Sequence, residues 1–379
     1  MVTGKGTPIE ARCGDAVERL PNLPTLTKLP DEGWTTIEVP SDDLDLAVST
    51  ILDALADLRR RFPDARFVAD YTGGTKTMSA ALVMAALELD GIALQIITGA
   101  RADLIKVHDG SQSGLAIYTE GIRLRRAMAP YLAAWGRFAY GEAADGLAGL
   151  AAPRDATLRG ELQIATGLSR ALDAWDRFDH QSALRGMEIY RNRIGATAGA
   201  WFTAAKCLTS SVDDPKRTPA QLWDLWLNAH RRAAQARYDD AVARLYRLIE
   251  WTAQWLLRTK GIDTSDLDAS QVPSGLQVAP ATNGKLKVGL RDAWELAAHH
   301  LDGPVRAFVE QERDHLLDHL LRRNGSILAH GETPVGPTDW AAFSGWAETA
   351  LIPLLRSEAA RVGLKSLSPQ LPSEPFWRT

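Results

Sequence analysis

The hydrophobic pattern of this chain changes near residue 123, and that change does most to limit the folds it can adopt. Before it, short runs rich in β-branched residues alternate with stretches whose apolar residues recur at helical spacing. Strands are predicted at 34–39, 66–70 and 92–97, and helices at 44–62 and 76–89. This order predicts a parallel sheet with helices on its faces. Further short strands are expected at 103–107 and 115–119.

After residue 123, apolar residues recur every three or four positions, which predicts an almost entirely helical region. Helices are expected at 124–149, 159–189, 220–232, 235–259, 289–301, 304–322 and 338–361. Segment 260–288 is rich in turn-forming residues and predicts a long loop or a partly ordered insertion. The tail after Gly363 holds three prolines and is expected to run irregularly over the surface. The predicted fold class is an α/β domain over 1–122 followed by an all-helical domain over 123–379.

Composition excludes several classes of protein. Hydrophobic residues make up 45% of the chain and charged residues 24%, which is typical of a globular protein. Two cysteines, Cys13 and Cys207, are too few for a disulfide scaffold or a cysteine-rich zinc site. No apolar run reaches the roughly 18 residues of a membrane helix, and residues 1–20 lack a secretory signal, so we expect a cytoplasmic protein.

Charge is distributed unevenly along the chain. Residues 1–122 contain 11 Lys and Arg against 18 Asp and Glu, whereas 123–379 contain 32 against 29. This balance excludes a broad basic coating for nucleic acid but permits a local cleft, and stable DNA binding is not expected.

A glycine-rich turn is the most informative motif of the first domain. Thr72, Gly73, Gly74, Thr75 and Lys76 lie between a predicted strand and a predicted helix. Paired glycines let the backbone approach an anion, the first amides of the next helix point at it, and the threonines and lysine add hydroxyls and a positive charge. A plain strand-to-helix connection is the alternative.

The residues of this turn exclude two other phosphate-binding motifs. A Walker A loop needs glycine directly before its lysine and again five positions earlier, where this chain has Thr75 and Asp70. A dinucleotide fingerprint needs a residue between its first two glycines, and Gly73 and Gly74 are adjacent.

The stretch from Thr72 to Met78 matches the complete Thr-Gly-Gly-Thr-Lys-x-Met signature of CARF domains, the sensors of type III CRISPR ancillary proteins, and the first domain resembles that family. The resemblance implies a Rossmann-like fold, dimerisation, and cyclic oligoadenylate bound across the two-fold axis against residues 72–76. CARF domains usually open with a strand whose following loop lines the ligand pocket, and nothing before Trp34 is typical of it. We expect either that the sensor lacks this strand or that the chain begins downstream of the true start.

Ribonucleases of the HEPN class, which accompany CARF sensors, carry arginine and histidine separated by four to six residues. Chance alone gives about two such spacings in a chain with this many arginines, and three occur. Arg101/His108 falls in the predicted sheet, and Arg313/His319 lies on a helix face of alternating charge. The third, Arg323/His330, has Asn324 after the arginine and Leu-Ala-His-Gly at its end, and it resembles the HEPN motif.

On a regular helix, Arg323 and His330 would project from one stripe about 10 Å apart along the axis. That separation is too large for one pair to grip a single phosphate, whereas two copies related by a dimer axis could line one cleft. The alternative for His330 is a helix C-terminal cap.

Together the resemblances imply a cyclic-oligoadenylate-activated, metal-independent endoribonuclease of type III CRISPR defence that acts as a homodimer on single-stranded RNA without a cofactor. His330 would act as acid or base, Arg323 would stabilise charge on the phosphate, and Asn324 would orient groups. Which member of the pair transfers protons, and whether cyclic tetra- or hexa-adenylate activates, stays open. Two alternatives are a ring nuclease that cleaves its activator at the turn, and a ligand-gated CARF regulator without nuclease activity.

Three other groups of residues receive structural interpretations. The stripes that contain Trp223 and Trp226 are expected to pack in a core or dimer interface rather than against bases. His299 and His300 lack the order of a zinc motif. The segment 175–180 is assigned to helix packing and surface ion pairs.

Overall fold

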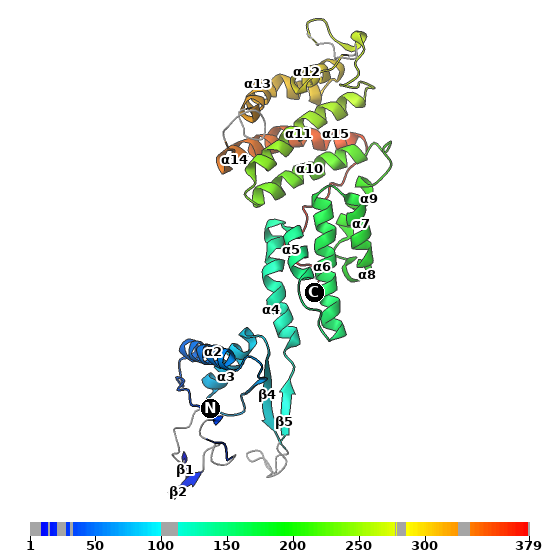
Figure 1. Ribbon diagram of the computed structural model, residues 1–379. Coiled ribbons are helices and arrows are strands. Elements are labelled where there is room, and N and C mark those ends of the chain that lie inside the picture. The colour runs from blue at the N-terminus through cyan, green and yellow to red at the C-terminus, as the bar shows by residue number, and fades with distance from the viewer. Residues whose placement is uncertain are drawn as a thin grey trace. The chain divides into compact units, whose positions relative to one another are not determined.

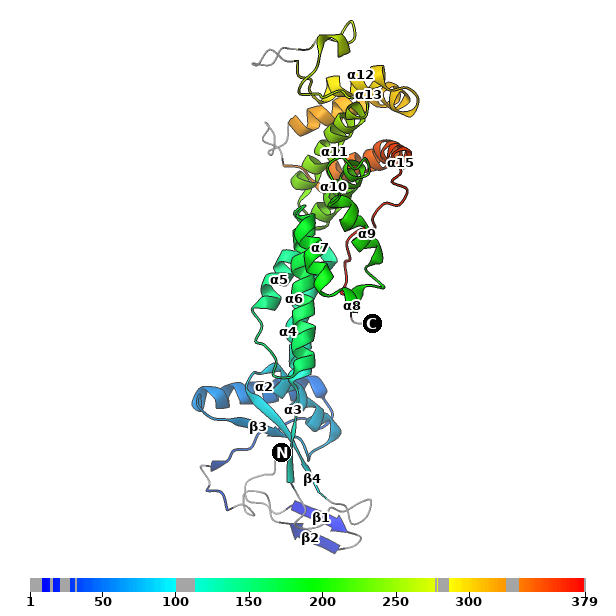
Figure 2. The same cartoon turned by 90° about the vertical axis from the view of Figure 1, so that its right-hand side faces the viewer.

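In the computed structural model, the chain forms two compact units, residues 1–125 and 126–379 (Figures 1 and 2). The structure describes residues 9–13, 16–20, 28–30, 33–99, 113–276, 278, 286–324 and 334–377. The side chains of 9–20 and 317–324 are outside that description. None of the helices within these ranges combines the length and apolar character that a membrane crossing requires.

The first unit contains a hairpin and a mixed sheet. Its elements are β1 (Ile9–Cys13), β2 (Ala16–Leu20), α2 (Leu44–Arg61), β3 (Phe67–Asp70), α3 (Lys76–Glu88), β4 (Ile92–Thr98) and β5 (Ser113–Ile117). β1 and β2 pair antiparallel with each other. The sheet has the order β3-β4-β5, with β3 parallel and β5 antiparallel to β4. The expected parallel pair and both expected helices are therefore confirmed.

Local sequence explains where these helices begin and end. Asp43 caps α2 by accepting a hydrogen bond from the Leu46 amide at 3.0 Å. Pro63 stops the same helix, because proline has no amide hydrogen and restricts the residue before it. The guanidinium of Arg123 donates to the carbonyls of Ala86 at 2.7 Å and Leu89 at 2.9 Å, which satisfies acceptors at the end of α3.

The core of the first unit lies between α3 and one face of the sheet. Ala69, Ala86, Ile92 and Leu94 are buried there, with side chains of α2 and α3 packed against them. Because side chains alternate along a strand, Gln95 points to the opposite face of the sheet from Leu94. Polar groups at the carboxyl ends of β3 and β4 are thereby kept out of the core.

The second unit is helical. Its elements are α4 (Glu120–Ala133), which begins in the first unit, then η2 (Ala134–Arg137), α5 (Tyr140–Ala148), α6 (Ala156–Asp176), α7 (His180–Ile189), α8 (Arg191–Ile194), α9 (Gly199–Leu208), α10 (Arg217–Ala234), α11 (Tyr238–Arg258), η3 (Ala269–Gln271), α12 (Leu290–His300), α13 (Pro304–Asn324), α14 (Pro337–Trp346), the π-helical η4 (Ala347–Leu351) and α15 (Ile352–Arg361). Trp223, Trp226, Leu245 and Trp255 are buried in its main core, which confirms their assignment to packing.

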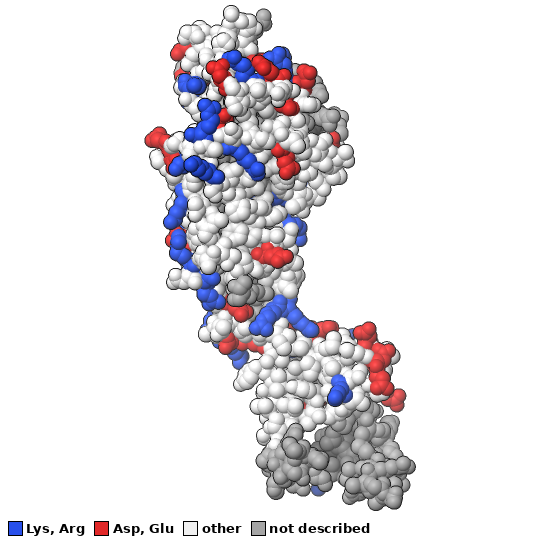
Figure 3. Space-filling model, turned by 180° about the vertical axis from the view of Figure 1, so that it is seen from behind, with Lys and Arg blue, Asp and Glu red and all other residues white. Residues whose placement is uncertain are grey.

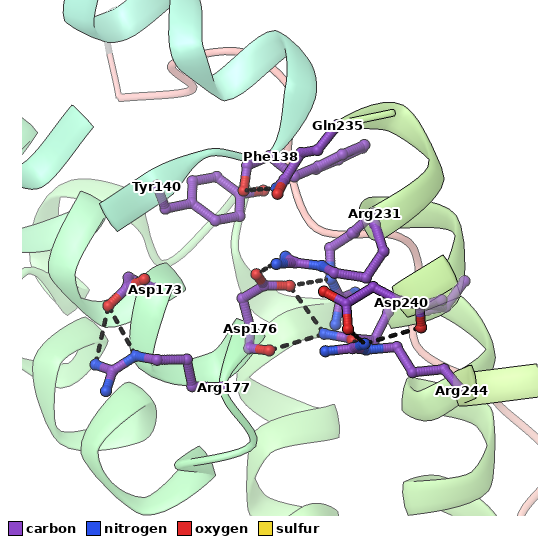
Figure 4. Close-up of polar contacts among 12 residues, drawn as sticks. Phe138, Tyr140, Asp173, Asp176, Arg177, Arg231, Gln235, Asp240 and Arg244 are labelled. Atoms are coloured by element: carbon purple, nitrogen blue, oxygen red, sulfur yellow. Dashed lines mark hydrogen bonds and ion pairs between the residues drawn. The ribbon is translucent and has the colours of Figure 1, made fainter. Parts of the chain in front are cut away.

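A charged network is buried in this unit (Figure 4). The guanidinium of Arg231 is fully buried and donates to Asp176 Oδ1 at 2.8 Å and to Asp224 Oδ1 at 3.1 Å. Asp224 also accepts from Trp175 Nε1 at 3.0 Å, and its other oxygen lies 2.9 Å from His180 Nε2. Burial alone would raise the pKa of Asp224, but Arg231, His180 and Trp175 outweigh it and lower that pKa below its ordinary value.

The expectation of surface ion pairs at 175–180 is therefore wrong for Asp176 and His180, which are both buried. Their partners lie on α10, more than 40 residues away in the sequence, and make burial of the charges tolerable.

Several predicted elements differ from the observed ones. Segment 34–39 has no strand pairing in the described structure, the hairpin β1–β2 and helices α8 and α9 were not predicted, and segment 103–107 lies outside the described residues. Helices expected over 124–149 and 159–189 are each interrupted, because Phe138 (φ 57°) and Phe178 (φ 64°) adopt left-handed backbone that ends a helix. The stretch 338–361 changes to a π-helix at η4.

The tail after Gly363 is irregular, as predicted, and two of its side chains are buried against the helical unit. Leu371 and Trp377 are only 3% and 7% exposed. Their burial means that this segment is part of the helical unit's packing.

Candidate functional site

The glycine-rich turn connects the carboxyl end of β3 to the first residue of α3. Gly74 has φ +95°, a conformation that side chains with a Cβ rarely adopt, so glycine is required there. Thr75 caps α3 by accepting from the Met78 amide at 3.2 Å. By helix geometry the amides of Lys76 and Thr77 have no partner within α3. Together with the exposed Lys76, these amides suit an anion.

The two threonine hydroxyls of the turn are engaged within the chain. Thr72 Oγ1 donates to Asp70 Oδ1 at 2.5 Å and accepts from the Ile97 amide at 2.6 Å. Thr75 Oγ1 donates to the carbonyl of Ser41 at 3.1 Å. In this arrangement the threonines brace the turn, and the backbone amides and Lys76 are the groups left for a ligand.

Asp70 is a bracing residue that sequence reasoning missed. Its Oδ1 also accepts from the Thr72 amide at 2.9 Å, and its Oδ2 accepts from Gln95 Nε2 at 3.2 Å. Burial opposes ionisation, but the hydrogen bonds from Thr72 and Gln95 prevail and lower the pKa of Asp70. An aspartate two residues before a turn amide is a recognisable signal. Gln95 carries no such signal, because its contact arises from the register that pairs it with Asp70.

A cavity of about 690 Å³ lies beside the turn. Apolar side chains from segment 37–39, α2, α3 and β4 form most of its lining, and the remainder comes from Thr35, Asp70, Thr72, Gly73, Gly74 and Ser79. Its size falls in the range of small-molecule sites in proteins.

The predicted nuclease motif lies largely outside the described side chains. Arg323 and Asn324 are the last two residues of α13, and only their backbone is described; His330 lies outside the described residues. Beyond that segment, the Val335 amide donates to Asp239 Oδ1 at the start of α11, at 3.1 Å. The chain after the motif is therefore attached to the helical core.

Two polar contacts help to fix the helix before the motif. Arg313 of α13 pairs with Glu295 of α12 at 2.9 Å. Glu312 Oε2 accepts from Trp346 Nε1 of α14 at 2.7 Å. These contacts tie α13 to both neighbouring helices and limit where its last turn, with Arg323, can lie.

The remaining sequence candidates are engaged elsewhere or not described. His300 Nε2 lies 2.7 Å from the Gln271 carbonyl, and no group of three potential metal ligands gathers within the described part of the chain. Arg101 and His108 lie outside the described residues. On the face seen in Figure 3, Lys and Arg side chains follow one edge of the helical unit, with Asp and Glu among them.

Part of the helical unit matches a known family model. Residues 212–352 match the family model described as "Csm6 HEPN domain", and this range includes Arg323, Asn324 and His330. Among solved structures, the chain resembles Enterococcus italicus Csm6 bound to cyclic hexa-2'-fluoro-hexa-dAMP, with a TM-score of 0.49 and 13% identity over 86% of this chain and 76% of that chain. No curated protein matches the chain. The resemblance to type III CRISPR ancillary ribonucleases and the predicted fold class, an α/β unit followed by a helical HEPN unit, are confirmed.

Proposed function

We propose that this chain, whose residues 212–352 match the Csm6 HEPN domain model, is an endoribonuclease that cyclic oligoadenylate activates in type III CRISPR defence. The sensor would comprise residues 1–122 and the nuclease 123–379, working as a homodimer on single-stranded RNA. The single observation that carries the proposal is the HEPN match, because it covers an Arg-Asn-x(5)-His motif that the sequence suggested independently.

The reaction needs no group beyond the chain's own residues and the RNA. The ribose 2'-hydroxyl attacks the adjacent phosphorus and gives up its proton to a base, while the bond to the 5'-oxygen breaks and that oxygen takes a proton from an acid. The products are a 2',3'-cyclic phosphate and a 5'-hydroxyl. In this proposal His330 moves a proton, Arg323 stabilises charge on the phosphate, and Asn324 orients groups.

The activator would bind at residues 72–76. Support comes from the positive φ of Gly74, the first amides of α3, which have no partner within that helix, the exposed Lys76 and the cavity of about 690 Å³ beside them. A ring that binds the active arrangement of the dimer more tightly than the inactive one shifts the population toward activity.

Cleavage of a fluorescent RNA, with and without cyclic tetra- and hexa-adenylate, tests the nuclease. We expect ring-dependent cleavage that persists in EDTA and is abolished by Arg323→Ala and by His330→Ala. Arg306→Ala is the matched control, because it removes an arginine near the other end of the same helix, where it pairs with the exposed Asp302 at 2.8 Å. Cleavage that survives both motif variants would refute the assignment.

The sensor is tested by binding of a labelled ring to Lys76→Ala, with Arg60→Ala as the control. Arg60 is an exposed base of the same unit that pairs with Asp57 at 3.3 Å. We expect weaker binding only for Lys76→Ala. Consumption of the ring without RNA cleavage would favour a ring nuclease, and binding without either reaction would favour a regulator.

A further inference from the structure

We propose that the C-terminal segment 364–377, here called the clasp, ties the helices before the HEPN match to the helices within it and carries the activation signal between them. The clasp follows α15 and has no regular secondary structure over its described length. Its role in signalling rests on the proposed function, since a signal exists only if the ligand activates the nuclease. Its role as a tie follows from contacts of three kinds.

The first kind of contact joins the clasp backbone to two indoles. Trp223 Nε1, on α10 inside the HEPN match, donates to the Ser368 carbonyl at 2.8 Å. Trp201 Nε1, on α9 before the match, donates to the Gln370 carbonyl at 3.1 Å. Helices from the two parts of the unit therefore hold carbonyls only two residues apart. These bonds satisfy two backbone carbonyls of the clasp that have no partner in a helix or a strand.

The second kind of contact joins the clasp to the buried charged network. Gln370 Oε1 accepts from Arg231 at 2.8 Å, and Gln370 Nε2 donates to the Leu227 carbonyl at 3.0 Å. Arg231 also pairs with Asp176 of α6, as Figure 4 shows. Since Arg231 is fully buried, the amide of Gln370 satisfies a donor that water does not reach.

The third kind of contact anchors the end of the clasp. Phe376 and Trp377 pack on Trp135, with ring centroids 6.2 and 5.2 Å apart, and Tyr140 Oη donates to the Pro372 carbonyl at 2.7 Å. Trp135 is fully buried and lies in η2, directly after α4, the helix that begins in the first unit. A shift at the end of α4 would therefore reach Trp135, then the clasp, and through Gln370 the helix α10.

A thiol under the clasp can report whether it is docked. Cys207 lines a cavity of about 150 Å³ together with Ser366, Leu367 and Ser368 of the clasp. Burial raises the pKa of the Cys207 thiol, which slows its reaction in the docked state. The chain has one other cysteine, so Cys13→Ser leaves Cys207 as the sole thiol.

The experiment compares Phe376→Ala/Trp377→Ala with Glu374→Ala in the Cys13→Ser background. Glu374 is exposed in the same segment and serves as the matched control. We expect Cys207 of the double variant to react with a thiol reagent about tenfold faster or more, because truncating the buried Trp377 and the half-buried Phe376 costs more packing free energy than a tenfold shift requires. Ring-stimulated RNA cleavage should fall by about tenfold or more, since a tenfold loss corresponds to about 1.4 kcal/mol of coupling. Ring binding and basal cleavage should match the control.

Two milder variants keep the test valid if the double variant fails to fold. Gln370→Ala leaves both aromatic anchors in place and should lose less ring stimulation than the double variant. Trp377→Phe keeps an aromatic ring at this position and should retain most of the ring stimulation. A double variant with exposed Cys207 and full stimulation would overturn the signalling role. Unchanged Cys207 reactivity would overturn the tie itself. Failure of the proposed function would give a different result. The parent protein would then bind no ring or cleave no RNA, while Cys207 would still react faster in the double variant than in the control.

Discussion

Replacing Arg231 with methionine should destabilise the helical unit by about 3–5 kcal/mol, the usual cost of removing one partner from a buried ion pair. Arg231 is fully buried and bonds two carboxylates, those of Asp176 and Asp224. Asp176 keeps Arg232 as a partner, but Asp224 would retain only the neutral donor Trp175 and the ring of His180. The cost is therefore dominated by the carboxylate of Asp224, which is 1% exposed.

Arg177→Met is the matched control for this substitution. Arg177 also bonds an aspartate, Asp173, at 2.9 Å, but its side chain is 67% exposed. Pairs of this kind contribute about 0–1 kcal/mol, because water competes for both charges. The two substitutions thus remove the same side chain from ion pairs of similar length that differ in burial.

Denaturant unfolding followed by tryptophan fluorescence measures both variants. Eleven of the twelve tryptophans lie in residues 126–379, so the signal reports mainly on the helical unit. Unfolding should be analysed for this unit alone, because a chain of two units need not unfold in one step. Equal losses of unfolding free energy in the two variants would refute the argument from burial.

Three further substitutions test the turn and the helical core. Gly74→Ala should destabilise the first unit by about 1–3 kcal/mol in thermal unfolding, because φ is +95°, whereas Gly73→Ala at a glycine without positive φ should cost less. Asp70→Asn should reduce the acid sensitivity of the first unit: the folded pKa lies below the ordinary value of 3.8, so its stabilisation is present above that pH and lost as pH falls through the folded pKa. His230→Phe should reduce the stability that is lost as pH falls below about 6.5, since burial lowers the pKa of His230 and the unfolded state therefore takes up the proton first.

Each of these has an outcome that contradicts it. Equal melting temperatures for the two glycine variants would show that the backbone at Gly74 is unstrained. An unchanged acid midpoint in Asp70→Asn would mean that its hydrogen bonds do not favour the carboxylate. His230 makes edge-to-face contacts with Trp226 and Trp340, with centroids 4.3 and 5.1 Å away, and a phenylalanine preserves that packing. An identical pH profile in His230→Phe would therefore assign the pH dependence to another group.

The sequence predicted the turn because its determinants are local. A strand, a pair of glycines and a capping threonine lie within a few residues, so their pattern fixes the turn between β3 and α3. The same logic located α2, whose cap and terminating proline are adjacent to it. The HEPN motif was identified by resemblance, since its spacing alone occurs by chance.

Elements set by distant partners were not predictable in this way. The helix breaks at Phe138 and Phe178 leave no signal, because neither residue favours the left-handed conformation that it adopts. The burial of Asp176 depends on Arg231, 55 residues away. The tail's prolines correctly indicated irregular backbone but not its burial, which depends on indole donors from other helices.

Polar side chains that belong to no motif hold the motif-bearing segments in place. Asp70 and Gln95 brace the turn, Asp239 fixes the chain after the nuclease motif, and Gln370 joins the clasp to the core. A residue that contacts ligand or substrate can be removed without cost to folding, whereas a bracing residue leaves its partner unsatisfied when it is removed. Variants of the two kinds should therefore differ in folding stability. Lys76→Ala should lose ring binding at unchanged stability, while Asp239→Ala should lose cleavage and stability together.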